Sequence, residues 1–244
     1  VIAYSENGET DWSDEIRVRD AGTYTYYFRV TYTDNNNHNV YVSETPITVT
    51  ITRAEVNVIW NAPDTITYNG SDQLLDDEEH DPVVTASVNL LGDDGQNISL
   101  AVSVQGGGEF KNANAEGEHY TLEASFGSNV SDDVLGNYEL KAHTNSYTIE
   151  RLAVTIVAKS GTSVYGEDPN PQWNYAAGNA SFVDDGISVS VGTDASDTAD
   201  VGIYRTYIAG VSTENGALTN YTINGVNVED FGGYTADDEN DHDG

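Results

Sequence analysis

The chain contains no cysteine and no methionine. Without cysteine it cannot form disulfides or thiolate metal sites, so packing of the core, hard-ligand metals or other crosslinks must hold the fold. No run of 18 apolar residues occurs, and the sequence therefore predicts no helix that inserts into a membrane. Hydrophobic residues still make up 38% of the chain, which is too many for a disordered protein and enough for small β-sandwich cores.

Basic residues are scarce: nine lysines and arginines stand against 41 acidic residues, giving a net charge of −32. So acidic a surface repels phosphate backbones and anionic lipids, which excludes nucleic acid and membranes as partners. It favours cations and high salt, which screens the repulsion within the protein. We therefore expect an extracellular protein, secreted or on the cell surface, in saline or Ca²⁺-rich surroundings. An ordinary acidic secreted protein is the alternative.

Motifs for catalysis are also lacking. The sequence has no Gly-x-Ser-x-Gly nucleophile elbow, no His-Glu-x-x-His metal motif and no phosphate-binding loop. Its five histidines lie in polar contexts without the spacing of metal ligands. We predict that the protein is not an enzyme and requires no cofactor.

What the sequence does contain is a motif written more than once. Asp20-Ala-Gly-Thr-Tyr24 recurs as Asp200-Val-Gly-Ile-Tyr204, and a looser form, with one extra residue, spans 115–120. Repetition at long spacing is typical of tandem arrays, which are seldom enzymes. The predicted structural motif consists of Asp20, Gly22, Tyr24, Gly117, Tyr120, Asp200, Gly202 and Tyr204. In immunoglobulin-like sandwiches, such a tyrosine is buried and its hydroxyl binds nearby backbone, so we expect a structural role.

Alternating strands follow each motif, as in residues 23–32 and 47–51. The strongest helical candidate is a single turn near Ser131–Leu135. Strand runs into strand at Arg53 and again at Arg151, and such short joints favour stiff connections. We predict an all-β chain of tandem immunoglobulin-like or β-grasp-like modules arranged end to end. The predicted modules are an incomplete one over 1–53, full ones over 54–150 and 151–236, and an acidic tail over 237–244.

The full modules share further landmarks: Tyr68-Asn-Gly or Tyr165-Gly-Glu after the opening strand, then Asn137-Tyr138 or Asn220-Tyr221. These landmarks resemble the MBG and YDG-type repeat domains of bacterial cell-surface proteins and adhesins. The resemblance covers nearly all of residues 11–236 and implies extracellular tandem modules. It implies no catalytic residue. The motif at 117–120 and the strong acidity depart from the family pattern.

Acidic clusters are the candidate cation sites, because Ca²⁺ binds six to eight hard oxygens. No cluster completes a twelve-residue Ca²⁺ loop, and a solvated acidic loop is the competing interpretation. The candidate ligands are Asp76, Asp77, Asp93, Asp94, Asp132, Asp133, Asp241 and Asp243. Trp12 and Tyr27 are candidate exposed aromatics for glycan stacking or a partner surface, although packing against the missing half-module is an equal alternative.

Together these features predict a structural or adhesive segment of a bacterial surface protein, acting as a stalk or presenting module. Its partners would be neighbouring modules or copies of itself. Two alternatives remain open. One is a subunit of an extracellular filament, completed by strand exchange, in which another chain supplies the half missing from residues 1–53. The other is a module that binds a glycan or a host surface protein.

Overall fold

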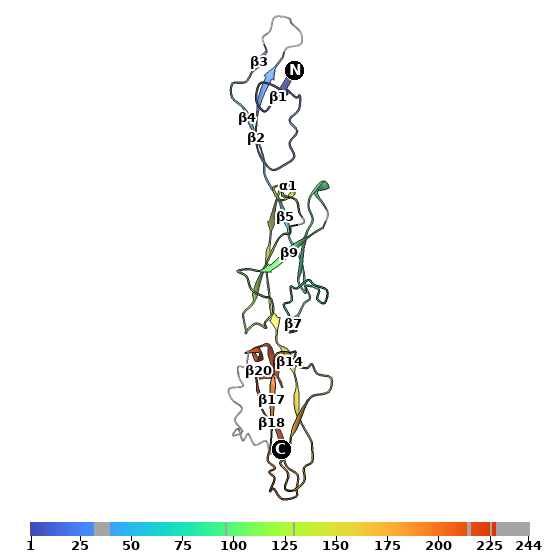
Figure 1. Ribbon diagram of the computed structural model, residues 1–244. Helices are drawn as coiled ribbons and strands as arrows, with labels where there is room; N and C mark the ends of the chain where they lie inside the picture. Colours follow the sequence, from blue (N-terminus) through green and yellow to red (C-terminus); the bar gives the residue numbers. More distant parts are fainter. Residues whose placement is uncertain (32–39, 96, 129, 214–215, 225, 228–244) are drawn as a thin grey trace. The chain divides into compact units, whose positions relative to one another are not determined.

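In the computed structural model the chain is mostly β, with 41% of the described residues in strands and 5% in helices (Figure 1). The structure describes residues 1–31, 40–95, 97–128, 130–213, 216–224 and 226–227. The strands form several small sheets and a nearly closed barrel of five strands. The β-rich class predicted from sequence is confirmed. Within the described ranges, no helix is both long enough and apolar enough to cross a membrane.

The N-terminal sheet has four strands: β1 (Ile2–Ser5), β2 (Gly22–Val30), β3 (Tyr41–Val42) and β4 (Ile47–Ile51). β2 is its long central strand and pairs antiparallel with β1, β3 and β4. The alternation of residues 23–32 does produce a strand, and Tyr26 is its most buried tyrosine. The strand therefore begins directly at the Gly-x-Tyr motif, as predicted.

The middle of the chain forms nine short strands and the predicted helical turn. A five-stranded sheet has the order β12-β10-β9-β8-β6. The apolar run 56–60 is not one strand, because Val58 separates β5 from β6. The elements are β5 (Ala54–Asn57), β6 (Ile59–Asn61), β7 (Ile66–Thr67), β8 (Thr85–Val88), η1 (Gly92–Asp94), β9 (Ile98–Val104), β10 (Tyr120–Phe126), α1 (Asp132–Leu135), β11 (Tyr138–Lys141), β12 (Thr144–Tyr147) and β13 (Ile149–Glu150).

The C-terminal part is also built from short strands, which form sheets of three, two and two strands among the described residues. β14 and β15 follow β13 with single-residue breaks, so strand continues into strand at Arg151 as predicted. β17 pairs antiparallel with β18, with a register shift after Ser190. The elements are β14 (Leu152–Val154), β15 (Ile156–Lys159), β16 (Gln172–Tyr175), β17 (Ser188–Thr193), β18 (Thr206–Ser212), η2 (Ala217–Asn220), β19 (Tyr221–Ile223) and β20 (Val226–Asn227).

Two parallel strand pairs have the same register. β11 pairs with β5, placing Tyr138 opposite Ala54, and β19 pairs with β14, placing Tyr221 opposite Leu152. In each case a short helical turn precedes the later strand and an Asn-Tyr pair begins it. The internal repetition seen in the sequence is thus also a repetition of structure.

The chain forms two compact units. Unit 1 comprises residues 1–60, 85–101 and 124–143, and unit 2 comprises residues 61–84, 102–123 and 144–244. The core of unit 1 includes Val56, Val88 and Tyr138, and that of unit 2 includes Phe110, Ile149 and Tyr221. Each unit therefore contains residues from two of the predicted modules, and the module boundaries remain a prediction.

Candidate functional site

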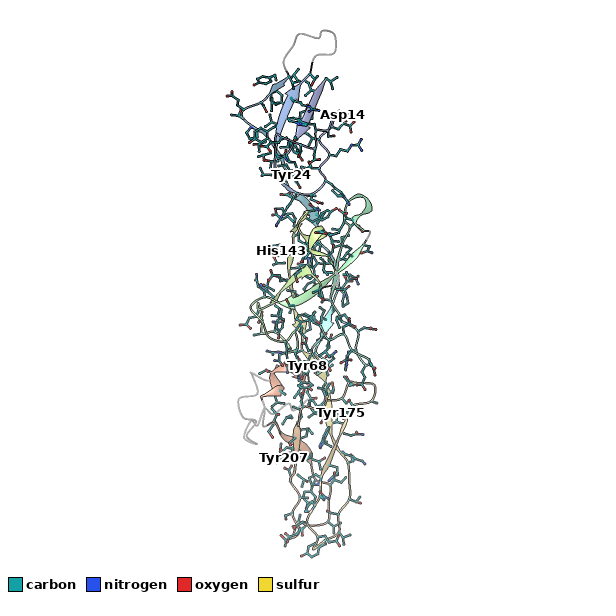
Figure 2. The ribbon with its side chains drawn as sticks, turned by 45° about the horizontal axis from the view of Figure 1, so that its top comes forward. Asp14, Tyr24, Tyr68, His143, Tyr175 and Tyr207 are labelled. Carbon is teal, nitrogen blue, oxygen red and sulfur yellow. The ribbon has the colours of Figure 1, made fainter. Side chains whose placement is uncertain are left out.

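The tyrosine of the repeated motif binds backbone four residues earlier. The hydroxyl of Tyr24 donates to the carbonyl of Asp20 at 2.9 Å, and that of Tyr204 to the carbonyl of Asp200 at 2.6 Å. Tyr24 lies on β2 in unit 1 (Figure 2). Neither side chain is fully buried, and Tyr204 is 38% exposed. The expectation of a buried tyrosine is therefore wrong at these positions, because each ring lies against the small glycine of its own motif and stays partly exposed.

The first and third motif glycines, Gly22 and Gly202, lie under the ring of the motif tyrosine, but a side chain there would meet it only at ordinary contact distance. A Cβ on Gly22 or Gly202 would lie 3.4–3.6 Å from the tyrosine ring two residues later. The ring thus lies directly against the glycine backbone. Gly117 differs, because it has a φ of +81° and an open surrounding, which marks a turn. The middle copy also reaches further back: the hydroxyl of Tyr120 donates to the carbonyl of Asn112, eight residues earlier, at 3.0 Å.

In unit 1, an asparagine binds the first motif. The amide oxygen of Asn137 accepts the backbone N–H of Ala21 at 2.5 Å, and its amide nitrogen donates to the carboxylate of Asp20 at 2.8 Å. The same nitrogen donates to the carbonyl of Asp133 in α1 at 2.9 Å. Asn137 therefore binds the loop of the first motif to the start of β11, across 116 residues of sequence.

In unit 2, a second asparagine repeats this arrangement. The amide oxygen of Asn220 accepts the backbone N–H of Ala113 at 2.8 Å, and its nitrogen donates to the side chain of Asn112 at 3.2 Å. Asn220 is only 3% exposed. Asn112 and Ala113 thus occupy the places of Asp20 and Ala21. In both units, one residue accepts the tyrosine hydroxyl with its carbonyl and the asparagine amide with its side chain.

The tyrosine after each asparagine binds an aspartate. In unit 1, the buried Tyr138 donates to Asp94 at 2.6 Å, and Arg19 forms an ion pair with the same carboxylate. In unit 2, Tyr221 donates to Asp185 at 2.5 Å, and Tyr68 donates to the same oxygen at 2.7 Å. The second donor is thus Arg19 in unit 1 and Tyr68 in unit 2.

Burial changes the acidity of these tyrosines. It raises the pKa of Tyr68 and Tyr221 above the ordinary value of 10.0, and the hydrogen bonds to Asp185 raise both further. Burial likewise raises the pKa of Tyr138, with a further rise from its hydrogen bond to Asp94. All three hydroxyls therefore keep their protons, and remain donors, over the ordinary range of pH.

Rings extend the contact in unit 2. Tyr68 meets Tyr221 edge to face with centroids 5.5 Å apart, and Phe182 meets Tyr221 at 5.1 Å (Figure 2 labels Tyr68). A Cβ on Gly70, whose φ is +87°, would come within 2.9 Å of Val183. The glycine of the Tyr-Asn-Gly landmark is therefore required both by its backbone conformation and by this close approach.

Where the structure describes them, the candidate cation ligands do not gather into a metal site. Among the described residues, no three histidine, aspartate or glutamate side chains are grouped to hold a metal ion. Asp77 bonds to His80, which lowers the pKa of its carboxyl, and Asp94 belongs to the contact with Tyr138 and Arg19. Asp76, Asp132 and Asp133 are exposed, Asp93 lies in η1, and Asp241 and Asp243 lie outside the described residues.

The candidate aromatic ligands are both partly covered. The guanidinium of Arg29 lies 4.7 Å from the centre of the Trp12 ring, and the indole N–H donates to the carbonyl of Glu9 at 3.3 Å. A Cβ on Gly8 would lie 3.0 Å from the ring of Tyr27, so backbone covers that ring. Each ring thus has a covering group from the chain itself, and a ligand-binding role for Trp12 and Tyr27 stays a prediction.

The strongest candidate site is therefore the repeated contact of an asparagine, a tyrosine and an aspartate. The Asn-Tyr pairs were visible in the sequence as landmarks, but the aspartates and the backbone groups they meet were not. Asp185 lies 36 residues from Tyr221 and 117 from Tyr68, and no local pattern joins them. No protein-family model, no curated protein and no solved structure matches the chain.

Proposed function

We propose that the chain is a structural segment of an extracellular bacterial surface protein, in which the Asn-Tyr contacts fix each repeat to the one before it. The observation that carries the proposal is the recurrence of the same contact in both units. Each copy uses an asparagine as donor and acceptor and a tyrosine hydroxyl on a carboxylate. Repeat proteins are stabilised by such nearest-neighbour interfaces.

The proposed module is the sequence repeat, with boundaries near 54 and 151. The short strand-to-strand joints at these boundaries leave little free linker, because β4 ends at Ile51 and β5 begins at Ala54, and β13 ends at Glu150 and β14 begins at Leu152. A spacer needs this combination of stiff joints and fixed neighbours more than it needs a pocket. The high negative charge keeps it soluble in saline surroundings.

The test of this role is whether the asparagines couple the motions of adjoining repeats. We would record ¹⁵N relaxation of backbone amides in β2 and β11, and in β7 and β18, for the parent and for a variant with Asn137→Ala and Asn220→Ala. The proposal is supported if the two strands of each pair share one rotational correlation time in the parent and have different times in the variant. Equal times in both proteins would contradict it.

Surface location and assembly need separate measurements. Antibodies raised against the chain should label intact cells of the source organism without permeabilisation. Light scattering after size-exclusion chromatography should give the mass of one chain, because a spacer needs no self-association. A polymer would instead favour a filament subunit.

A further inference from the structure

The third copy of the motif lacks the contact that the other two make. Its tyrosine is in place, since Tyr204 donates to the carbonyl of Asp200. Ala21 and Ala113 each donate their backbone N–H to an asparagine, and the residue at the same place in the third copy is Val201. Within the part of the chain that the structure describes, neither the N–H of Val201 nor the carboxylate of Asp200 has a hydrogen-bond partner.

The apolar side chains around this loop are exposed as well. Val201 is 97% exposed and Ile203 is fully exposed. Tyr165, which holds the landmark position of Tyr68, is 70% exposed, whereas Tyr68 is buried against Tyr221 and Asp185. Large apolar side chains that are exposed together mark an interaction surface.

A hollow of about 590 Å³ lies beside the loop. Residues 160–165 line one side of it and residues 199–204 another, so it includes both Tyr165 and Val201. These two segments correspond to the ones around Tyr68 and Ala113 in the preceding copy. There, Tyr221 and Asp185 contact Tyr68, and Asn220 binds Ala113.

We propose that Asp200, Val201 and Tyr165 form a docking site for a further repeat of the same kind, one that carries an Asn-Tyr pair and an aspartate. This inference rests on the proposed function and names its next partner. The asparagine of that repeat would accept the N–H of Val201 and donate to the carboxylate of Asp200, as Asn137 does at Ala21 and Asp20. Its aspartate would accept the hydroxyl of Tyr165, as Asp185 accepts that of Tyr68.

Charge supports an amide-bearing partner. Asp200 is a carboxylate, like Asp20, and the amide of Asn137 meets Asp20 with a donor and no negative charge. On a chain of net charge −32, a partner that presented a carboxylate to Asp200 would be repelled. In the two occupied copies, the side chain that accepts the amide is charged in one, Asp20, and neutral in the other, Asn112. The residue that donates the amide is asparagine in both.

The experiment extends the full chain by one repeat. A second copy of residues 149–244 is joined after Thr235, because Tyr234-Thr235 match Tyr147-Thr148 in sequence. Hydrogen exchange is then followed at the amide of Val201 by NMR. We expect exchange there to slow by about tenfold relative to the unextended chain, which is the upper effect of one net hydrogen bond. The same extension with Asn220→Ala in the appended copy should restore fast exchange.

Two results would overturn the proposal. One is a Val201 amide that already exchanges slowly in the unextended chain, since the site would then be covered by this chain itself. The other is unchanged exchange in the extended chain. Should the appended copy fail to fold, residues 51–150 are appended instead, bringing Asn137, Tyr138 and Asp94 to the site, and no protection there counts against the proposal. Loss of protection at Ala21 and Ala113 on replacing Asn137 and Asn220 tests the proposed function independently.

Discussion

Replacing Asn220 with alanine should destabilise unit 2 by about 2–3 kcal/mol. The side chain is nearly fully buried and makes two hydrogen bonds, to Ala113 and Asn112. Each such bond contributes about 1 kcal/mol net, and a backbone N–H left unpaired in a part-buried place costs further. Asn137→Ala should cost unit 1 about 1–2 kcal/mol, because Asn137 is only half-buried and water can replace part of its bonding.

Aspartate at the same positions sharpens the prediction. Asn220→Asp keeps an acceptor for Ala113 but buries a carboxylate at a position only 3% exposed, so it should cost at least as much as Asn220→Ala. Asn137→Asp replaces the amide nitrogen that now lies 2.8 Å from the carboxylate of Asp20 with a second carboxylate oxygen. It should cost more than Asn137→Ala at low salt, and the difference should shrink as salt screens the repulsion.

Urea unfolding measures both units if they are observed separately. Trp173 lies in unit 2, within 5.1 Å of the ring of Tyr175, so its fluorescence follows unit 2 in a background with Trp12→Phe and Trp60→Phe. Asn170→Ala is the matched control, because that side chain is exposed and bonds only to Gln172. It should change stability by less than about 0.5 kcal/mol. A midpoint for Asn220→Ala equal to that of Asn170→Ala would refute the role assigned to the contact.

Three further predictions follow from the same contacts. The raised pKa values of Tyr68 and Tyr221 favour the protonated hydroxyls in the folded state, so the stability that they contribute should be complete below pH 10 and should decrease above it. Melting temperatures measured from pH 8 to 11.5 should therefore fall steeply only above about pH 10, and the fall should be smaller in a Tyr68→Phe variant. Gly70→Ala should destabilise unit 2 by more than Gly166→Ala, because both glycines have a similar positive φ but only at Gly70 would a Cβ clash with Val183. Equal losses of unfolding free energy in urea would show that the approach of Val183 does not require a glycine. Tyr204→Phe should cost about 0.5–1.5 kcal/mol, since its partly exposed hydroxyl makes one bond to backbone, and a loss above 3 kcal/mol in thermal melts would show a buried corner instead.

The sequence predicted what depends on neighbours along the chain. Alternation located β2 and β4, the Ser131–Leu135 pattern located α1, and the unbroken runs at Arg53 and Arg151 located the joints between strands. The division of 56–60 at Val58 was not predictable, because Val58 itself favours a strand and its neighbours alternate as in a strand. Parallel pairing of β5 with β11 was equally hidden, since 80 residues lie between the two strands.

The candidate site was predictable only in part. The two Asn-Tyr pairs and the tyrosines of the motif were recognisable by repetition. Their partners were not, because Asp94 and Asp185 sit in a sequence with 41 acidic residues, where no single carboxylate stands out. Asn112 was missed for a different reason: the loop before Tyr120 is four residues longer than its counterparts, so the acceptor lies outside the expected motif.

The parallel pairing of β14 with β19 has a mechanical consequence. In a parallel pair, the start of one strand and the end of the other lie at opposite ends of the ribbon. Tension that enters at Leu152 and leaves after Ile223 therefore acts along the strands, in shear, and strains the hydrogen bonds between them together. In an antiparallel hairpin the same tension would peel the bonds apart one at a time. The pairing of β5 with β11 has the same geometry, so tension that enters at Ala54 and leaves after Lys141 is resisted in the same way.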